Sequence, residues 1–418
     1  MNILIVNVHS ALNLGDDAIM YTTIRSIQHR FPDANITVAA NDPDSWAKYE
    51  HIEVSNALCT WIANCRLGLW RQRFYLTPFV ILFLCLSAIL FRLFNIGLHT
   101  GSYEKDQLLD AYFNTDLVLS CGGGNFYAHG PLSPGFVWNL ITLGFAVGLK
   151  KRVIMLPQSI GPIEHWWQRV LAKAILNRVD TIMVREPESE RFIISTLKLT
   201  RPPIPIPDLA FGLPPVVGRL PVKITQNDSK LRVGFTIIDR SAQNPNFLDQ
   251  ETYEDAICSL ITKLDQEYSA EIFLIIQCYG PSKDQDDRNI TNRIYQRLQN
   301  HIANISVLDN FNDALEIKSA IKALDFVIGT RMHTGIFALS NSIPVILMGY
   351  QPKTCGMMKS FGLPKYCCEM EEVTEQGLDD LIEDLQRNLD DLKWEISANF
   401  SKTLDALSKW ITYLDSES

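Results

Sequence analysis

The hydrophobic positions of this chain form short apolar runs that alternate with longer segments of helical periodicity. Asn2–Val8 is apolar enough to be a buried strand, and Asp16–Arg30 follows it with isoleucines repeating along one helical face. The alternation continues, with further strands predicted at Asn35–Ala40, Asp116–Ser120, Arg152–Leu156 and Asp180–Val184. Strands separated by helices predict a mostly parallel sheet with helices on both faces.

A proline-rich passage interrupts this pattern near the middle of the chain. Arg201–Pro221 reads RPPIPIPDLAFGLPPVVGRLP, a composition that resists regular helix and suits a linker. A strand at Leu231–Ile237 restarts the pattern, and the polar stretch from Glu371 onward is predicted to be helical. The later strands are predicted at Glu271–Gln277, Ile305–Leu308, Leu324–Ile328 and Pro344–Leu347. The chain therefore predicts two Rossmann-like α/β domains, residues 1–212 and 213–418.

Composition and charge narrow the function classes. The net charge of -9 argues against a general nucleic-acid-binding protein, which would carry a basic surface, but it is compatible with a local basic pocket for a small anion. The nine cysteines include no C-x-x-C pair, which favours reduced thiols in a cytosolic protein and argues against structural zinc. The N-terminal MNILIVNVHS lacks the basic region of a signal peptide. We therefore expect a cytoplasmic protein.

The apolar segment Phe74–Phe91 does not fit the α/β pattern. It reads FYLTPFVILFLCLSAILF, has no charged residue and approaches the roughly 20 residues that span a bilayer. A single crossing would separate strands that should share one sheet. The insertion over residues 70–98 is therefore a monotopic or re-entrant membrane anchor, a helix docked on the domain surface, a dimer contact or a long buried helix. Flanking arginines and Trp70 favour contact with the inner face of the cytoplasmic membrane.

Candidate chemistry lies where predicted strands end, and the first case is the stretch NLGDD after the first strand. Gly15 permits a tight turn, and Asp16 either caps the next helix or faces a ligand at the helix N-terminus. Asn13 is a candidate for substrate contact. Capping alone explains Asp16 equally well.

Two further strand ends offer neutral polar groups. The residues are Gly122, Gly123, Gly124 and Asn125 after one strand, and Gln158 and Ser159 after the next. A glycine run lets backbone N–H groups approach a ligand closely. The amide and hydroxyl of the second pair suit sugar hydroxyls, although the stretch PQSIGP is also compatible with a rigid turn.

Charged side chains follow three other strands. Arg185 stands at the end of one strand, where its planar guanidinium suits a carboxylate or phosphate, or where it could pair with Glu186 or Glu188. Asp208 lies near the linker as a candidate hinge contact. In the second half, GTRMHTGIFAL carries Arg331 and His333 at a strand-to-helix turn, a position that favours anions and a titratable imidazole. Tyr350 and Lys353 follow the next strand, and Lys353 adds another cation.

Taken in this order, these motifs resemble the polysaccharide pyruvyl transferase family. The matching pieces are Asn13–Asp16, Gly122–Gly124, Gln158–Pro162, Arg185 with Ser189, Asp208, Arg331–His333, and Tyr350 with Lys353 and Gly356. The resemblance covers nearly the whole chain. It implies a fold similar to the two-domain glycosyltransferase-B arrangement, with the active site in the interdomain cleft. It also implies transfer of the enolpyruvyl unit of phosphoenolpyruvate onto a sugar, which forms a pyruvate ketal.

The resemblance also implies roles for the residues found at strand ends. Arg185, Arg331 and Lys353 are expected to bind the phosphate and carboxylate of the donor, and His333 is expected to transfer protons. The acceptor is expected to contact Asn13, the glycine run and Gln158. Phosphoenolpyruvate is the donor substrate, so no separate cofactor and no metal are expected. The apolar insertion suggests that the glycan acceptor is carried on a membrane lipid.

Two alternatives remain open from the sequence. A nucleotide-sugar-dependent glycosyltransferase shares the architecture, but it often needs a Glu for the ribose, and none lies within Arg331–Leu339. A non-catalytic membrane-associated scaffold would have no physical need for Arg and His together. A homo-oligomer is compatible with either function.

Overall fold

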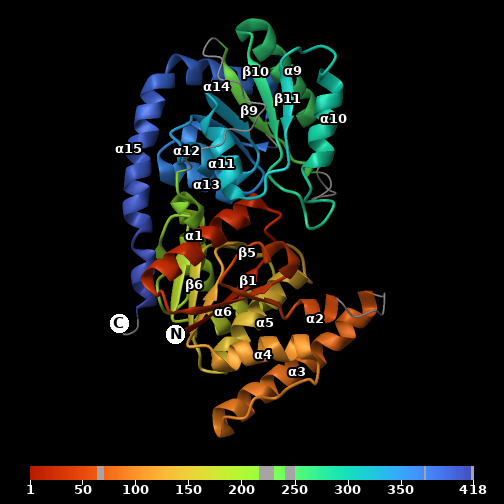
Figure 1. The fold of residues 1–418 in the computed structure, drawn as a ribbon, viewed down its shortest axis with the longest axis vertical. Helices are drawn as coiled ribbons and strands as arrows, with labels where there is room; N and C mark the ends of the chain where they lie inside the picture. The colour runs from red at the N-terminus through yellow and green to blue at the C-terminus, as the bar shows by residue number, and fades with distance from the viewer. Residues whose placement is uncertain (64–69, 216–229, 241–249, 371–372, 416–418) are drawn as a thin grey trace. The chain divides into compact units, whose positions relative to one another are not determined.

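The computed structural model describes residues 1–63, 70–215, 230–240, 250–370 and 373–415 (Figure 1). The chain forms two compact domains. The first domain comprises Met1–Ala11, Ile19–Asp208 and the chain from Ser408 onward, and the second comprises Leu12–Ala18 and Leu209–Leu407. The sequence predicts a single domain boundary between residues 212 and 213. In the structure, Leu12–Ala18 belongs instead to the second domain, and the chain from Ser408 onward belongs to the first.

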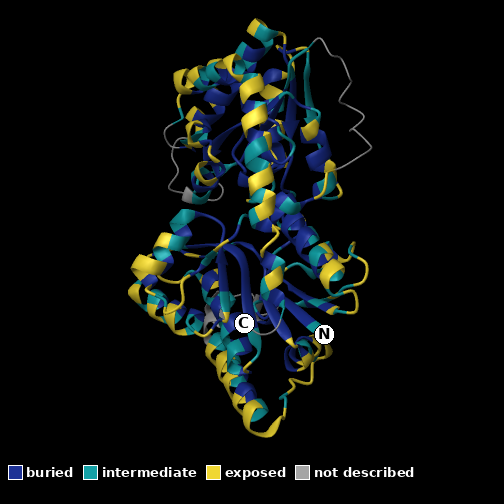
Figure 2. Cartoon of the chain, turned by 90° about the vertical axis from the view of Figure 1, so that its left-hand side faces the viewer, coloured by how far each residue is buried: buried dark blue, intermediate teal, exposed yellow. Residues whose placement is uncertain are grey.

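The sheet of the first domain is parallel throughout, with the order β3-β2-β1-β4-β6-β7-β8, and β5 pairs with β6. Its strands are β1 (Asn2–Val8), β2 (Asn35–Ala40), β3 (Glu53–Asn56), β4 (Leu117–Ser120), β5 (Gly123–Ala128), β6 (Arg152–Ile163), β7 (Thr181–Val184) and β8 (Ile204–Pro205). Figure 2 shows these strands buried. Burial on both faces explains why they appear as continuous apolar runs in the sequence.

Helices cover the first sheet, and a few short turns of helix connect them. They are α1 (Leu14–Arg30), α2 (Thr60–Ala63), α3 (Trp70–Phe94), α4 (Tyr103–Asn114), α5 (Pro134–Gly148), α6 (Trp166–Leu176) and α7 (Pro187–Arg191), with the 3-10 helices η1 (Pro43–Trp46) and η6 (Trp410–Leu414) and the π-helix η2 (Phe192–Leu197). The end of the chain is held here because the Arg152 guanidinium donates to the carbonyls of Tyr413, Leu414 and Asp415.

The sheet of the second domain is also parallel, with the order β11-β10-β9-β12-β13-β14. Its strands are β9 (Arg232–Thr236), β10 (Glu271–Ile275), β11 (Ile305–Leu308), β12 (Phe326–Gly329), β13 (Val345–Gly349) and β14 (Cys367–Glu369). Its helices are α9 (Gln250–Tyr268), α10 (Arg288–Leu298), α11 (Ala314–Lys322), α12 (Met332–Leu339), α13 (Pro352–Phe361), α14 (Glu375–Arg387) and α15 (Leu389–Leu407), with the 3-10 helices η3 (Leu209–Gly212) and η4 (Pro364–Tyr366). The prediction of two parallel-sheet α/β domains is confirmed.

Three predictions differ from the structure. The proline-rich passage contains β8 and η3 before its last part, residues 216–221, leaves the described residues. The strand predicted at Arg152–Leu156 continues to Ile163 as β6. The expectation of reduced thiols is wrong for one pair, since Cys355 and Cys367 form a disulfide with their Cα atoms 5.4 Å apart.

The apolar insertion forms α3, which lies along the surface of the first domain. One side packs on the domain, with Leu84 and Ala88 buried and the ring of Phe91 stacked 4.9 Å from that of Phe113. Leu76–Phe94 is long and apolar enough to cross a membrane by length and composition, yet only 17% of this window is buried. The buried-helix alternative is therefore wrong. The side chains of Trp70, Arg71 and Arg73 lie outside the described residues.

Candidate functional site

In the second domain, Arg331 and His333 lie at the carboxyl end of β12, where α12 begins. Arg331 has extended backbone geometry and is the N-cap residue of α12. The turn is fixed by hydroxyl groups: Thr330 donates to the carbonyl of Thr236 at 3.0 Å, and Thr334 donates to the Gln277 side-chain carbonyl at 2.5 Å. Because these bonds join three neighbouring strands, the start of α12 is held rigidly.

The Arg331 guanidinium is paired with a buried carboxylate. Its Nη2 donates to Oδ1 of Asp287 at 2.5 Å and to the carbonyl of Gln285 at 3.1 Å, and its Nε lies 3.3 Å from Oδ2 of Asp287. Burial disfavours the charged guanidinium, but the Asp287 carboxylate outweighs that effect and raises the pKa of Arg331. Asp287 lies 44 residues before its partner and belongs to no motif recognised in the sequence.

The Asn13–Asp16 segment lies in the second domain, against the same end of the sheet. Asn13 forms an isolated antiparallel bridge with Cys278, and the Leu14 N–H donates to the carbonyl of Gln277 at 3.2 Å. Asn13 caps α1, since its Oδ1 accepts from the Gly15 N–H at 3.1 Å and its Nδ2 donates to Asp16 at 3.1 Å. The cap expected of Asp16 is therefore supplied by Asn13.

Gly15 lies directly against the His333 imidazole. A Cβ at residue 15 would lie 2.7 Å from Cε1 of His333 and closer still to Nδ1, distances that real Cβ contacts essentially never show. Only glycine allows α1 to begin here with the ring in its present position. The structure thus brings Asn13, Gly15 and Asp16 together with Arg331 and His333. From the sequence, Asn13 was expected to contact the acceptor and Arg331 the donor.

Cys278 beside this group is not a nucleophile. Burial raises the pKa of its thiol to about 12, with the negative charge of Asp287 adding to the effect and Arg331 opposing it. The thiol therefore stays protonated at neutral pH. The imidazole of His333 is the acid–base group that this cluster offers.

Tyr350 and Lys353 follow β13, the strand that pairs with β12. Tyr350 comes directly after β13, and Lys353 lies half-buried in the first turn of α13. The guanidinium carbon of Arg240 lies 5.2 Å from the centroid of the Tyr350 ring. Arg240 was missed from the sequence, although it follows a predicted strand just as Arg185 and Arg331 do.

In the first domain, the glycine run begins a strand instead of a loop. Gly123 is the first residue of β5 and has φ +127°, a conformation that favours glycine. A Cβ at Gly122 would lie 2.9 Å from the Pro157 carbonyl oxygen. Close approach of two backbones therefore explains Gly122 without a ligand. Asn125 lies further along β5, and its Nδ2 donates to the carbonyl of Asn7 at 3.1 Å.

Gln158 is completely buried inside β6, so the turn expected after Leu156 is not there. Its Nε2 donates to the Ser120 hydroxyl at 2.9 Å, and Nδ2 of Asn7 donates to the same hydroxyl at 3.1 Å. Oε1 of Gln158 has no hydrogen-bond partner within the described part of the chain. A buried, unsatisfied carbonyl is costly unless a ligand or water donates to it.

Arg185 lies in a buried network of charged and hydroxyl groups. It forms an ion pair with Asp208, lies 3.5 Å from Glu186 and donates through Nε to the Ser159 hydroxyl at 2.9 Å. Ser159 in turn donates to Glu186 at 3.0 Å. Arg185 and Asp208 side chains are each only 2% exposed. The pairing with Glu186 that the sequence left open is present, so the charge of Arg185 is largely compensated.

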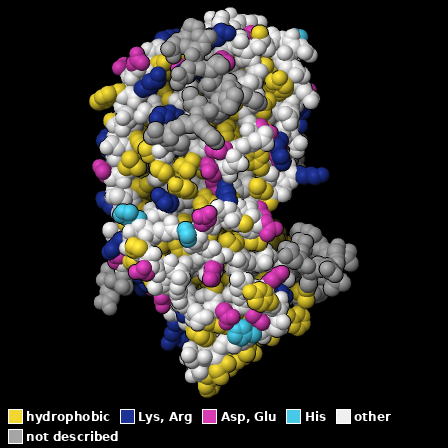
Figure 3. All heavy atoms as spheres, in the orientation of Figure 1, with side chains coloured by type: hydrophobic (Ala, Val, Ile, Leu, Met, Phe, Trp, Pro, Cys, Tyr) yellow, Lys and Arg dark blue, Asp and Glu magenta, His cyan; other side chains and the backbone are white. Residues whose placement is uncertain are grey.

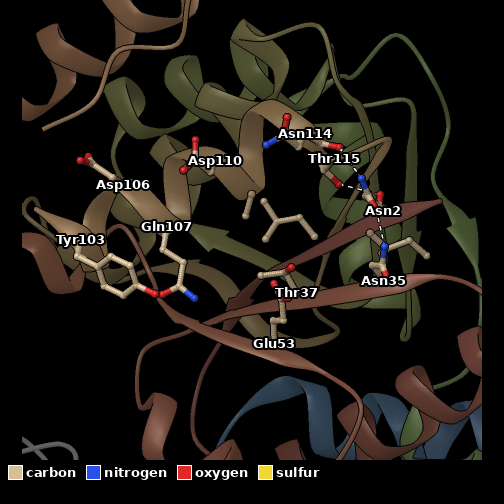
Figure 4. A pocket seen from close by; sticks show the side chains of 13 residues that line it. Asn2, Asn35, Thr37, Glu53, Tyr103, Asp106, Gln107, Asp110, Asn114 and Thr115 are labelled. Carbon is tan, nitrogen blue, oxygen red and sulfur yellow. Dashed lines mark hydrogen bonds between the residues drawn. The ribbon is translucent and has the colours of Figure 1, made fainter. Parts of the chain in front are cut away.

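A pocket of about 550 Å³ in the first domain is separate from these residues. It lies at the amino ends of β1 and β2 beside α4, and Figure 4 shows Tyr103 and Gln107 on one side of it and Asn2 and Asn35 on the other. Its lining includes carboxylates and no Lys or Arg, so it does not suit an anionic donor. None of the candidate residues predicted from the sequence lines it.

No group of three or more His, Cys, Asp or Glu side chains in the described ranges is arranged to hold a metal ion. Metal independence stays a prediction.

The two-domain architecture defines a structural class that includes sugar-nucleotide epimerases and glycosyltransferases. A Staphylococcus aureus MnaA structure with UDP is similar, with TM-score 0.60 and 10% identity, covering 100% of this chain and 98% of that chain. The Streptomyces nogalater glycosyltransferase SnogD has TM-score 0.50 and 13% identity, with 98% and 99% covered. These likenesses concern the fold alone.

Within that class, the chain belongs to the polysaccharide pyruvyl transferase family, whose family model matches residues 13–352. It is also 24% identical over 408 residues to the amylovoran biosynthesis protein AmsJ of Erwinia amylovora, covering 95% of each chain. The resemblance predicted from the motifs is confirmed. The protein is a transferase that acts on polysaccharide.

Proposed function

We propose that this protein transfers the pyruvyl unit of phosphoenolpyruvate to a sugar of an exopolysaccharide or its lipid-linked precursor, as a cyclic ketal. The observation that carries the proposal is the cluster at the carboxyl end of β12, where the imidazole of His333 lies beside Arg331 and against Gly15. Family membership supports the reaction type. The amylovoran relative supports an acceptor in an extracellular polysaccharide.

His333 is the proposed proton carrier. A proton is added to the methylene carbon of phosphoenolpyruvate, which leaves positive charge at the carbon that bears the phosphate. One sugar hydroxyl adds to this carbon and loses its proton to the imidazole. This proton replaces the one that the imidazole delivered to the methylene carbon. The carbon–oxygen bond to phosphate then breaks, and the second hydroxyl closes the ketal as its proton leaves with the phosphate. An imidazole can both give and take protons, which suits these steps.

Cations of the second domain are proposed to bind the donor. Lys353 in the first turn of α13 and the N-terminus of α12 favour the phosphate and carboxylate. Arg331 is held in place by Asp287, so its role is to present a fixed donor of hydrogen bonds more than to add net charge.

Neutral groups of the first domain are proposed to bind the acceptor. The unsatisfied Oε1 of the buried Gln158 is the observation that supports this assignment. Sugar hydroxyls donate to such a carbonyl without bringing charge into the protein. The Arg185 network, with Ser159 and Asp208, is proposed to hold this part of the domain in place.

Phosphate release tests the function. The wild type should release inorganic phosphate from phosphoenolpyruvate only when the glycan is present, and product mass should rise by one pyruvate ketal. His333→Gln should abolish both signals and leave the far-UV circular dichroism spectrum unchanged. Transfer from a nucleotide sugar, with no phosphate release from phosphoenolpyruvate, would contradict the proposal.

Membrane docking through α3 is proposed as the route to a lipid-linked acceptor. Five side chains point away from the domain at helical spacing and are 48–70% exposed: Phe79, Leu82, Leu86, Ile89 and Leu93. Figure 3 shows hydrophobic side chains along the lower edge of the first domain, where α3 lies. The helix contains no acidic residue and carries Arg92 in its last turn, which suits an anionic lipid surface. Since its other side packs on the domain, α3 is proposed to lie in the interface instead of spanning the bilayer.

A further inference from the structure

Arg240 lies at the same edge of the second sheet as Arg331 and Tyr350. It follows β9 by a few residues, and β9 pairs in parallel with β12, which pairs with β13. Parallel strands place their carboxyl ends together. The loops after β9, β12 and β13 therefore carry Arg240, Arg331 and Tyr350 to one end of one sheet.

Two contacts fix Arg240 in this position. Its guanidinium stacks on the ring of Tyr350 at 5.2 Å, and its backbone N–H donates to the side chain of Gln250 at 2.9 Å. Gln250 is held in turn by donating to Glu254 at 2.9 Å. The Tyr350 ring and the Gln250 side chain therefore hold Arg240 from two sides.

Among the residues that the structure describes, Arg240 has no ion-pair partner, in contrast to Arg331. Arg331 is paired with Asp287. The acid next to Arg240 in the chain, Asp239, is engaged by Arg293 at 3.1 Å. Across the described ranges, no carboxylate lies within ion-pair distance of Arg240, and its buried Nε has no hydrogen-bond partner.

A buried donor without a hydrogen-bond partner is energetically costly, so its presence needs an explanation. Desolvation of a cation with no counter-charge adds to that cost. Both costs vanish when an anion binds to the guanidinium. A planar fork with a free Nε edge accepts two oxygens of a phosphate or carboxylate side by side.

We infer that Arg240, stacked on Tyr350, binds an anionic group of the donor and is a further donor-binding residue. This inference rests on the proposed function, because it names phosphoenolpyruvate as the anion. Arg240 supplies net positive charge that the paired Arg331 does not. Tyr350 acts as a positioning residue, since its ring holds the guanidinium flat.

Thermal stabilisation and initial-rate kinetics test the inference in the full-length protein. Phosphoenolpyruvate should stabilise the wild type, and Arg240→Met should raise the apparent Kd and the KM for phosphoenolpyruvate by on the order of 10- to 100-fold. The KM for the glycan should stay unchanged. Arg240→Lys keeps a charge without the fork and should fall between the two. Tyr350→Leu should weaken donor binding less than Arg240→Met, and Tyr350→Phe less again.

Arg387→Met is the matched control. Arg387 lies on α14 of the same domain with its side chain 72% exposed, so its loss should leave both constants unchanged. Unliganded melting temperatures and circular dichroism spectra separate loss of binding from loss of fold, and Arg240→Gln provides a second neutral variant.

The outcomes distinguish the inference from the function on which it rests. If the wild type binds phosphoenolpyruvate and the Met and Gln variants bind it equally well, Arg240 has no part in donor binding and the inference is overturned alone. If phosphoenolpyruvate does not stabilise the wild type and yields no phosphate with the glycan, the proposed function fails and the inference with it.

Discussion

Gly15 lies so close to the imidazole of His333 that the two positions constrain each other. The ring occupies the space that any side chain at residue 15 would need. The backbone N–H of Gly15 donates to Oδ1 of Asn13, which holds Gly15 in place. His333 is held because it lies in the first turn of α12, whose N-cap residue is Arg331. The imidazole proposed to transfer protons is therefore positioned by a segment far away in the sequence.

Gly15→Ala should displace the His333 ring and lower kcat on the order of 10²-fold, because small displacements of a reacting group have large effects on rate. Stability should change little, since alanine favours helix. Initial-rate phosphate release and thermal unfolding measure the two effects. Gly135→Ala is the matched control: Gly135 is likewise the second residue of a helix, α5, but a Cβ there meets nothing within 4 Å. Equal activity of both variants would contradict the close contact.

Breaking the Arg331–Asp287 pair should cost much more than breaking a surface pair. Asp287→Ala leaves the Arg331 guanidinium buried without its counter-charge, so the free energy of unfolding should fall by about 3–5 kcal/mol. Glu383→Ala removes the exposed partner of Arg387 and should cost about 0.5 kcal/mol or less.

Urea denaturation of Asp287→Ala, Arg331→Met and the double variant Asp287→Ala/Arg331→Met measures the coupling. The double variant should lose less than the sum of the single losses, because neither charge is then left alone. Additive losses would show that the pair is not coupled.

The stability of the protein should rise with pH through the titration of Lys318. This side chain is 1% exposed and donates to the carbonyl of Leu213 at 2.5 Å, and burial lowers its pKa from 10.5 to about 8. Between pH 8 and 10.5 the unfolded chain binds the proton more strongly than the folded chain. Folding is therefore opposed below pH 8, and this penalty is lost as the pH rises toward 10.5.

Urea denaturation across this pH range compares the wild type with Lys318→Met. Relative to the variant, the wild type should gain on the order of 1 kcal/mol per pH unit. Lys359→Met, which removes an exposed lysine in the last turn of α13, controls for general charge effects. Parallel curves for the wild type and Lys318→Met would show that Lys318 titrates normally.

Charged substitutions on α3 should release the protein from membranes. Leu82→Glu and Leu86→Glu place acids on the exposed face, so binding to vesicles containing anionic phosphatidylglycerol should fall at least 10-fold because apolar burial is lost and anionic lipids repel the new charge. Flotation of wild type and variants measures this binding. Val170→Glu alters an equally exposed apolar side chain on α6 and should have little effect. Membrane docking would be contradicted if the wild type did not bind vesicles and instead formed dimers through this face of α3. Light scattering would detect such dimers.

The alternation of apolar runs was enough to predict both sheets, because strands buried on two faces leave a strong signal. The same reasoning failed at β6. Pro157 and Gly161 look like a turn, but the strand continues to Ile163 because it pairs with β5, whose approach depends on the missing side chain of Gly122. That pairing is a long-range contact and leaves no local pattern.

Residues at strand ends were a sound guide to individual candidates but not to their partners. Arg331 and His333 could be chosen by position, whereas Asp287 has no motif and is identified only by its bond to Arg331. Arg240 could have been found by the same rule, since it follows the strand predicted at Leu231–Ile237. Arg185, Gln158 and Ser159 belong to the first domain, whereas Arg331 and His333 belong to the second. This assignment depends on the tertiary fold, and the catalytic and binding roles of these residues stay predictions.

Because Leu12–Ala18 belongs to the second domain, the chain cannot be divided into its two domains at a single point. A fragment that starts after the proline-rich passage would carry every strand of the second sheet, yet it would lack Asn13 and Gly15, which hold and border the imidazole. Such a fragment could fold and still be chemically incomplete. Exchange of one half for that of a relative with another specificity must therefore move the start of α1 together with the second half, or the hybrid inherits a mismatch at His333.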